Sequence, residues 1–176
     1  MRPRLVVLGL VALLAACGGG QDPAATPARD ELVATADVER LLVSTQKRTS
    51  PRLRVGTAHC PDQVRLANGT EFTCTVEIEG VEAPYSVTLR DLDAGKASGR
   101  FALEPAKPII DVTRIVRLIR SSLQPGARGA TVRCGPAKVR VVEIGAAIPC
   151  TITLGDAVQK VNAVVKDLKG TVVVRS

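Results

Sequence analysis

Residues 69–79 read GTEFTCTVEIE, and their apolar and polar side chains alternate with a period of two. This alternation predicts a β-strand whose apolar face carries Cys74 inward, between Phe72 and Val76, while threonines and glutamates occupy the opposite face. Asn68-Gly69, just before the strand, is typical of a two-residue hairpin turn. A strand with one apolar face needs a cover, which favours an α+β fold in which a helix packs on an antiparallel sheet.

Two helices are expected to supply that cover. The second has the i, i+3, i+4, i+7 spacing of an amphipathic helix, with Asp111 as a good N-cap and Pro125-Gly126 as a stop. Its apolar stripe consists of Val112, Ile115, Val116, Ile119 and Leu123. A weaker stripe, which ends before Pro51, consists of Val38, Leu41, Leu42 and Thr45.

A repeat relates the two halves of the chain. The matched segments are Asp37-Val38-x-Arg40 with Asp111-Val112-x-Arg114, Cys60 with Cys134, Cys74-Thr75 with Cys150-Thr151, and Asp91-Leu92 with Asp167-Leu168. Tandem duplication is the economical explanation. The sequence therefore predicts two tandem units, each with one helix packed on an antiparallel sheet of about four strands. We place repeat 1 at residues 30–104 and repeat 2 at residues 105–176.

The cysteines fit this division. Apart from Cys17, the chain holds Cys60, Cys74, Cys134 and Cys150, an even number that argues for disulfides in an exported protein. Four cysteines allow three pairings, and the repeat selects Cys60–Cys74 and Cys134–Cys150, one inside each unit. A loop of this size stabilises the fold by about 3 kcal/mol in the chain-entropy model. A Cys-x-x-Cys redox or metal site is excluded by the spacing.

The N-terminus has the features of an export signal. Arg2 and Arg4 precede an apolar run, residues 5–13, that is too short to span a bilayer. Leu14-Ala15-Ala16-Cys17 then resembles the lipobox of bacterial lipoproteins. That resemblance implies a signal peptide at residues 1–16, cleavage before Cys17, a diacylglyceryl thioether on its sulfur and acylation of its new amine. The alternatives are an ordinary secretory signal and an uncleaved anchor.

Residues 17–29 contain two prolines and little to bury, which predicts a flexible tether. Two or more acyl chains would anchor the protein stably, on the extracytoplasmic side of the cell membrane.

The first unit also resembles a known family. His59-Cys60-Pro61, followed by Asn68-Gly69-Thr70-Glu71-Phe72-Thr73-Cys74, looks like the Cys-Pro…Gly-x-x-Phe-x-Cys domain of unknown function found in actinobacterial lipoproteins and secreted proteins. The resemblance covers roughly residues 30–104 and, more loosely, residues 108–176, where Gly135 replaces Pro61 and Ile148 replaces Phe72. It implies no activity and no catalytic residue.

Composition argues against most chemistry. The 176 residues include one histidine, one tyrosine, two phenylalanines and no tryptophan. His-paired nucleophiles, multi-His metal sites and base-stacking platforms are therefore not expected. Ser44-Thr45-Gln46-Lys47 spells the S-x-x-K of penicillin-recognising enzymes, but the accompanying S-D-N and K-T-G elements are missing. We expect no enzyme, no cofactor, no metal and no nucleic-acid partner.

Charge separates the two units. Residues 30–104 carry nine Lys or Arg and twelve Asp or Glu residues, a net charge of −3, whereas residues 105–176 carry twelve and four, a net charge of +8. The outer strand face of the first unit is expected to offer Glu71, Glu77 and Glu79. The candidate anion-binding residues of the second unit are Lys160, Lys166 and Arg175 on its outer strand face, and Arg114, Arg117 and Arg120 on its helix. The alternative is charge drift after duplication.

These features predict a membrane-anchored lipoprotein of the cell envelope that acts as a non-catalytic binding or scaffolding module. Its basic second unit would dock an anionic partner: anionic lipid, a phosphorylated envelope polymer or an acidic protein. The alternative is a secreted-type protein inhibitor that clasps an enzyme with its sheets. The two-unit layout is similar to that of secreted inhibitors of β-lactamases, although the aromatic anchors of such interfaces are missing here.

Overall fold

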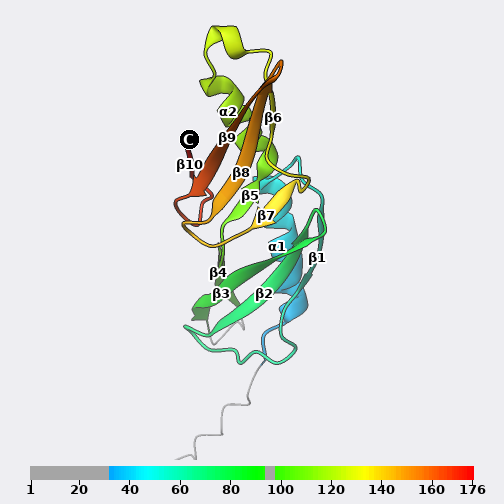
Figure 1. The fold of residues 1–176 in the computed structure, drawn as a ribbon. Coiled ribbons are helices and arrows are strands. Elements are labelled where there is room, and N and C mark those ends of the chain that lie inside the picture. Colours follow the sequence, from blue (N-terminus) through cyan, green and yellow to red (C-terminus); the bar gives the residue numbers. More distant parts are fainter. Residues whose placement is uncertain (1–31, 94–97) are drawn as a thin grey trace, which may run out of the picture.

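The structure, a computed structural model, describes residues 32–93 and 98–176 (Figure 1). The signal peptide, Cys17 and the tether predicted for residues 1–29 lie outside the described residues. Helices and antiparallel sheets, with strands dominating, make a mixed α+β fold, as predicted. The elements are α1 (Thr35–Thr49), β1 (Val55–His59), β2 (Glu71–Ile78), β3 (Val81–Asp93), β4 (Ser98–Pro105), β5 (Ile109–Asp111), α2 (Val112–Ser122), η1 (Pro125–Ala127), β6 (Thr131–Arg133), β7 (Val139–Val141), β8 (Ala147–Leu154), β9 (Ala157–Val165) and β10 (Val172–Arg175).

The first four strands form one antiparallel sheet in the order β1-β2-β3-β4. The period-two pattern of β2 holds in the structure: Cys74, Val76 and Ile78 are buried, whereas Glu71 and Glu77 are exposed. α1 covers the inner face and contributes Val38 and Leu42 to this core. We call this part of the molecule the first unit.

A second antiparallel sheet has the order β6-β8-β9-β10, and α2 covers one face of it. As predicted, Asp111 caps the helix: its Oδ1 accepts the backbone N–H of Thr113 at 2.8 Å. Val112, Ile115 and Ile119 are buried against this sheet. We call α2 and this sheet, with the loops that join them, the second unit.

A two-stranded ribbon, β5 paired with β7, lies between the two units (Figure 1). Its side chains contribute to both cores. Val139 is 1% exposed and belongs to the core of the first unit, against which Ile109 and Val141 also pack. Ile110 belongs to the core of the second unit. The ribbon was not expected from the sequence, and it makes the two units share apolar packing.

Two local expectations were wrong. Asn68-Gly69 is a turn but not a hairpin, because it lies in the long connection between β1 and β2; the Asn68 side chain accepts the N–H of Leu92 at 2.7 Å. The tight β2–β3 hairpin is instead at Glu79-Gly80, where φ is +51° and +80°. These left-handed conformations match the twist of a two-residue hairpin.

The buried stripe of α1 also differs from expectation. Val38, Leu42 and Gln46 face the core at i, i+4 spacing, while Leu41 is 37% exposed and Thr45 is partly exposed. Among the described residues, neither helix is long and apolar enough to cross a membrane.

Candidate functional site

The outer face of the second sheet gathers positive charge. Because alternate residues of a strand point to opposite faces, the side chains that do not face α2 lie together on this surface. Four of them are exposed cations, and we call them the basic sheet face: Arg133, Lys160, Lys166 and Arg175. The four strands of this sheet contain no aspartate or glutamate.

The strand register places these cations as neighbours. Arg133 of β6 lies opposite Thr151 of β8, which lies opposite Lys160 of β9, so the three share one row across the sheet. Arg175 of β10 lies opposite Asn162, two residues along from Lys160. Lys166 directly follows β9 and continues its outward alternation. The predicted triple therefore shares one face, and Arg133 is an addition that the sequence analysis missed.

The corresponding face of the first sheet is mainly acidic, although Arg90 and Arg100 also lie on it. Glu71 and Glu77 point outward from β2 as expected, and Glu77 lies directly opposite Glu82 of β3. Glu104 of β4 pairs with Ser86 on the same face. Glu79 does not belong to this face, contrary to expectation, since the hairpin turns its side chain into a contact with the second unit.

The arginines of α2 divide into two sets. Arg114 and Arg117 line a cleft of about 580 Å³ between the two units, whereas Arg120 does not. Arg52, from the loop after α1, and Lys169, from the β9–β10 turn, line the same cleft. The sequence analysis missed both, because they come from segments distant in the chain that only the packing of the two units brings together.

Both predicted disulfides are present. Cys60, just after β1, is bonded to Cys74 of β2 with an S–S distance of 2.05 Å. Cys134, just after β6, is bonded to Cys150 of β8 with an S–S distance of 2.00 Å. In each sheet, the disulfide thus joins the end of the edge strand to its neighbour. Across residues 32–93 and 98–176, no three His, Cys, Asp or Glu side chains cluster as metal ligands would.

The Cys60–Cys74 disulfide and the strands that it joins lie within a segment that matches a known family model. The chain carries a DUF4333 domain, a domain of unknown function, at residues 12–94. The matched segment contains α1 and β1 to β3, while β4 and the whole second unit follow it. Comparison with curated proteins and comparison with solved structures found no match.

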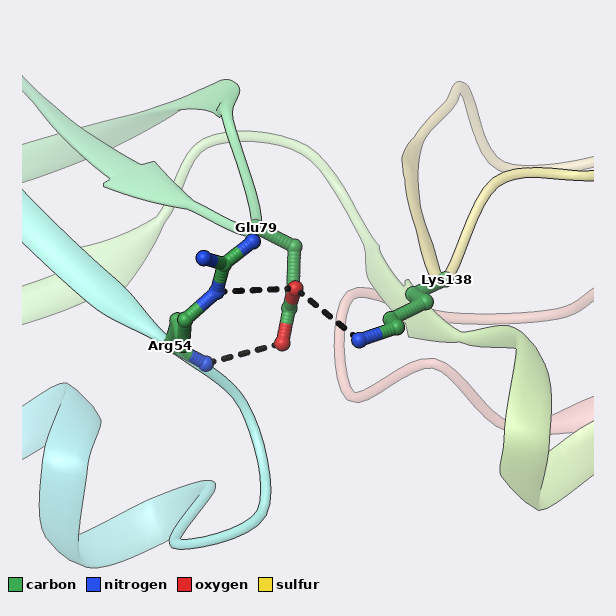
Figure 2. Close-up of polar contacts among 3 residues, drawn as sticks. All are labelled: Arg54, Glu79 and Lys138. Atoms are coloured by element: carbon green, nitrogen blue, oxygen red, sulfur yellow. Dashed lines mark hydrogen bonds and ion pairs between the residues drawn. The ribbon is translucent and has the colours of Figure 1, made fainter.

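Glu79 connects the DUF4333 domain to the second unit. Figure 2 shows its carboxylate between Arg54 of the same domain and Lys138, which precedes β7. One oxygen accepts the backbone N–H of Arg54 at 2.9 Å, and the other lies 3.5 Å from Arg54 Nε and 3.5 Å from Lys138 Nζ. The Glu79 side chain is 6% exposed, whereas the two cationic side chains remain largely in solvent.

These contacts favour the charged form of the carboxylate. The hydrogen bond from the Arg54 N–H has the largest effect, and together with the charges of Lys138 and Arg54 it lowers the pKa of Glu79 despite an opposing effect of burial. Glu79 therefore acts as an ionised contact between the DUF4333 domain and the segment that leads into β7.

Proposed function

We propose that the protein is a non-catalytic binding module of the cell envelope, and that its basic sheet face docks a phosphorylated envelope polymer. A single observation carries this proposal: Arg133, Lys160, Lys166 and Arg175 share one exposed sheet face whose strands contain no carboxylate. Within the described residues none of these four cations forms an ion pair, so their charges are available to a partner.

The spacing of the cations favours an extended polyanion. Neighbouring strands lie about 4.8 Å apart, so Arg133 and Lys160, two strands apart in one row, stand about 10 Å from each other. Lys160 and Arg175 are diagonal neighbours, with about 7–8 Å between them. A chain with repeated phosphate groups could follow this row and contact all four cations at once.

Other partners fit this face less well. The tether would lead from the membrane directly into the first unit, which places the acidic unit nearest the lipid headgroups and the basic unit farther along the chain. A clasping enzyme inhibitor would need exposed aromatic anchors. Tyr85 is 7% exposed, and Phe72 and Phe101 are partly buried against the first core, so none of the three is an exposed anchor.

The proposal also includes a lipid anchor at Cys17 and an origin of the two units by tandem duplication. We infer that Cys17 carries the lipid, because Leu14-Ala15-Ala16-Cys17 follows a short apolar run. We also infer that the two units are tandem copies. The matching sheet orders, a helix before each sheet, and a disulfide at the same place in each sheet support this inference. Duplication followed by divergence would then leave one acidic and one basic copy.

The test compares two charge reversals of equal size. Replacing Lys160, Lys166 and Arg175 by glutamate should reduce the affinity for a phosphodiester wall polymer by more than about tenfold, because it reverses three of the four cations. The matched control replaces Arg114, Arg117 and Arg120 by glutamate, which changes the net charge equally and leaves the sheet face intact. Wild-type binding should weaken steeply with salt, since the Debye length falls from about 10 Å at 0.1 M to about 3 Å at 1 M.

Two results would contradict the proposal. One is equal loss of binding in both triple variants, which would show an effect of net charge alone. The other is binding that does not respond to salt. Vesicles containing anionic phospholipid serve as a separate arm, and a stronger dependence of vesicle binding on Lys160, Lys166 and Arg175 would identify lipid headgroups as the partner instead.

A further inference from the structure

The cleft between the two units has the dimensions of a small-molecule site. Its volume of about 580 Å³ lies within the range of ligand pockets, about 300–1,000 Å³. Its walls come from the end of α1 and the following loop, from β3 and β4, from β5 and α2, and from the β9–β10 turn. Neither unit encloses it alone.

Charge in the cleft is strongly positive. Arg52, Arg114, Arg117 and Lys169 line it, against one carboxylate, Asp111. That carboxylate is engaged as the N-cap of α2, where it accepts the N–H of Thr113. Within the described residues none of the three arginines forms an ion pair or a side-chain hydrogen bond. Unpaired guanidinium groups that reach one cleft from both units suit an anionic group held among them.

The remaining wall is apolar. Leu53, Leu103, Pro105, Ile109 and Leu168 line the same cleft. Leu53, Leu103 and Ile109 are only partly covered by the first core, and Leu168 is 40% exposed. An inorganic ion would leave this surface in water, whereas a ligand with an apolar body would cover it and gain affinity from the apolar area removed from water.

A chain of hydrogen bonds lies beside these walls. Tyr85, which also lines the cleft, donates its hydroxyl hydrogen to Gln46 Oε1 at 2.5 Å, and Gln46 Nε2 donates to Ser50 Oγ at 3.0 Å. Gln46 is 6% exposed and is the buried polar side chain of the described core. Because the Ser50 hydroxyl accepts from Gln46, its own hydrogen remains to donate to a ligand oxygen.

A second hollow of about 550 Å³ adjoins the cleft. It shares Asp111, Arg114, Arg117 and Lys169, and it continues along α2 to Leu118, which is 43% exposed. Arg114 and Arg117 therefore line both hollows, and each hollow also contains apolar surface. This arrangement gives room for a chain that extends beyond the cationic groups.

From these features we propose that the cleft binds an amphipathic organic anion, with a carboxylate or phosphate head held by Arg52, Arg114, Arg117 and Lys169 and an apolar chain against Leu53, Leu103 and Leu168. The site is distinct from the basic sheet face, because none of the four cations of that face lines the cleft. The head contacts both units at once, so the bound ligand also holds them together.

The experiment titrates purified protein with decanoate and with decyl phosphate, below the concentrations at which they form micelles. Calorimetry gives the affinity, and tyrosine fluorescence gives the location, because the chain holds one tyrosine and no tryptophan and Tyr85 lines the cleft. R114E/R117E should weaken binding by about tenfold or more, the equivalent of losing one or two charge-assisted contacts. The control is R120E, a charge reversal on the same helix but outside the cleft, and it should bind like wild type.

Arg52→Glu provides an independent second variant in the first unit, and it should weaken binding similarly. The K160E/K166E/R175E variant should bind these amphiphiles normally, so failure here and failure of the envelope-polymer proposal are distinguishable. The inference is wrong if wild type binds neither amphiphile, if R114E/R117E binds as tightly as R120E, or if decyltrimethylammonium binds as well as decanoate. Equal affinity for inorganic phosphate and decyl phosphate would also overturn it, since the apolar wall would then contribute nothing.

Discussion

Glu79 Oε2 lies 3.5 Å from Lys138 Nζ, and this ion pair joins the β2–β3 hairpin of the first unit to the segment that enters β7. The next residue, Val139, is buried in the core of the first unit. The Lys138 carbonyl also accepts the backbone N–H of Val112, the first residue of α2, at 2.9 Å. Lys138 and Val139 thus fix the start of α2, and with it Arg114 and Arg117, relative to the first unit.

The shared packing predicts that the first unit depends on β7 for stability. Val139→Ala removes two buried methyl groups and should destabilise the first unit by about 2 kcal/mol. Urea unfolding followed by Tyr85 fluorescence reports this change, because Tyr85 lies in the first core. Val173→Ala is the matched control: Val173 is 43% exposed, so its truncation should change stability by less than about 0.5 kcal/mol. Equal effects of the two substitutions would show that the two cores are independent.

The contacts of Glu79 predict an acid-sensitive junction. The pKa of Glu79 is lowered from its ordinary value of 4.5, first by the hydrogen bond from the Arg54 N–H. A carboxyl whose pKa is lower in the folded state stabilises the fold above its unfolded pKa, and this stabilisation is lost as pH falls through the folded value. Glu79→Gln should therefore lower stability at neutral pH and flatten its decline toward about pH 3, measured by urea unfolding across that range.

Glu82→Gln is the control for this experiment. Glu82 is an exposed carboxylate on the strand that follows the same hairpin, opposite Glu77. Its substitution removes the same charge and leaves the contacts of Glu79 with Arg54 and Lys138 in place, so the difference between the two variants isolates those contacts. Asp167 also has a lowered pKa, chiefly because it accepts the backbone N–H of Thr171, so the E79Q variant should retain part of the acid sensitivity. An unchanged profile in E79Q would mean that the junction contact does not contribute.

The features predicted correctly from the sequence are those with strong local patterns. The alternation around Cys74, the stripe of α2 and the cap at Asp111 all appear in the structure. The β5–β7 ribbon could not be predicted, because each of its strands has three residues and Ile109 and Ile110 pack into different cores, which removes any period-two signal. Glu79 was wrongly predicted to lie on the outer strand face, because the alternation of β2 continues through Glu79 in the sequence. In the structure, the β2–β3 hairpin turn begins at this residue.

The cleft could not be predicted from the sequence, because its lining residues come from separate segments of the chain. Arg52 and Lys169 belong to loops, and nothing in their neighbouring residues indicates that they approach Arg114. Gln46 was absent from the stripe expected for α1, which contained Leu41 and Thr45 instead. The structure selects Gln46 because Tyr85 is buried opposite it and needs a hydrogen-bond acceptor.

Removal of either disulfide should lower the free energy of unfolding substantially. Replacing Cys60 and Cys74 together by alanine opens a loop with a sequence separation of 14 residues, which should cost about 3 kcal/mol by chain entropy. The change should lower the midpoint of unfolding seen by Tyr85 fluorescence. Replacing Cys134 and Cys150 is the matched comparison in the second unit. Peptide mapping without reductant should recover both pairs from wild type, and a peptide linking Cys60 to Cys134 would contradict the two-unit interpretation.

The last prediction concerns the pair Tyr85 and Gln46. The Tyr85 hydroxyl is buried and donates to Gln46 Oε1 at 2.5 Å, so removing either partner leaves the other without its hydrogen bond. Gln46→Leu and Tyr85→Phe should each destabilise the protein by about 1–3 kcal/mol, and the double variant should lose less than the sum because no orphaned polar atom remains. Circular dichroism follows unfolding here, since Y85F removes the fluorophore.

Tyr85 should also make the stability of the fold depend on pH in the alkaline range. Burial raises the pKa of Tyr85 above its ordinary value of 10.0, so the fold favours the neutral phenol. This stabilisation is complete below the unfolded pKa and is lost as pH rises through the folded value. Wild type should therefore lose stability above about pH 10 more steeply than Y85F does, measured by denaturation at increasing pH. Additive single substitutions together with parallel alkaline profiles would show that the hydrogen bond is not formed in solution.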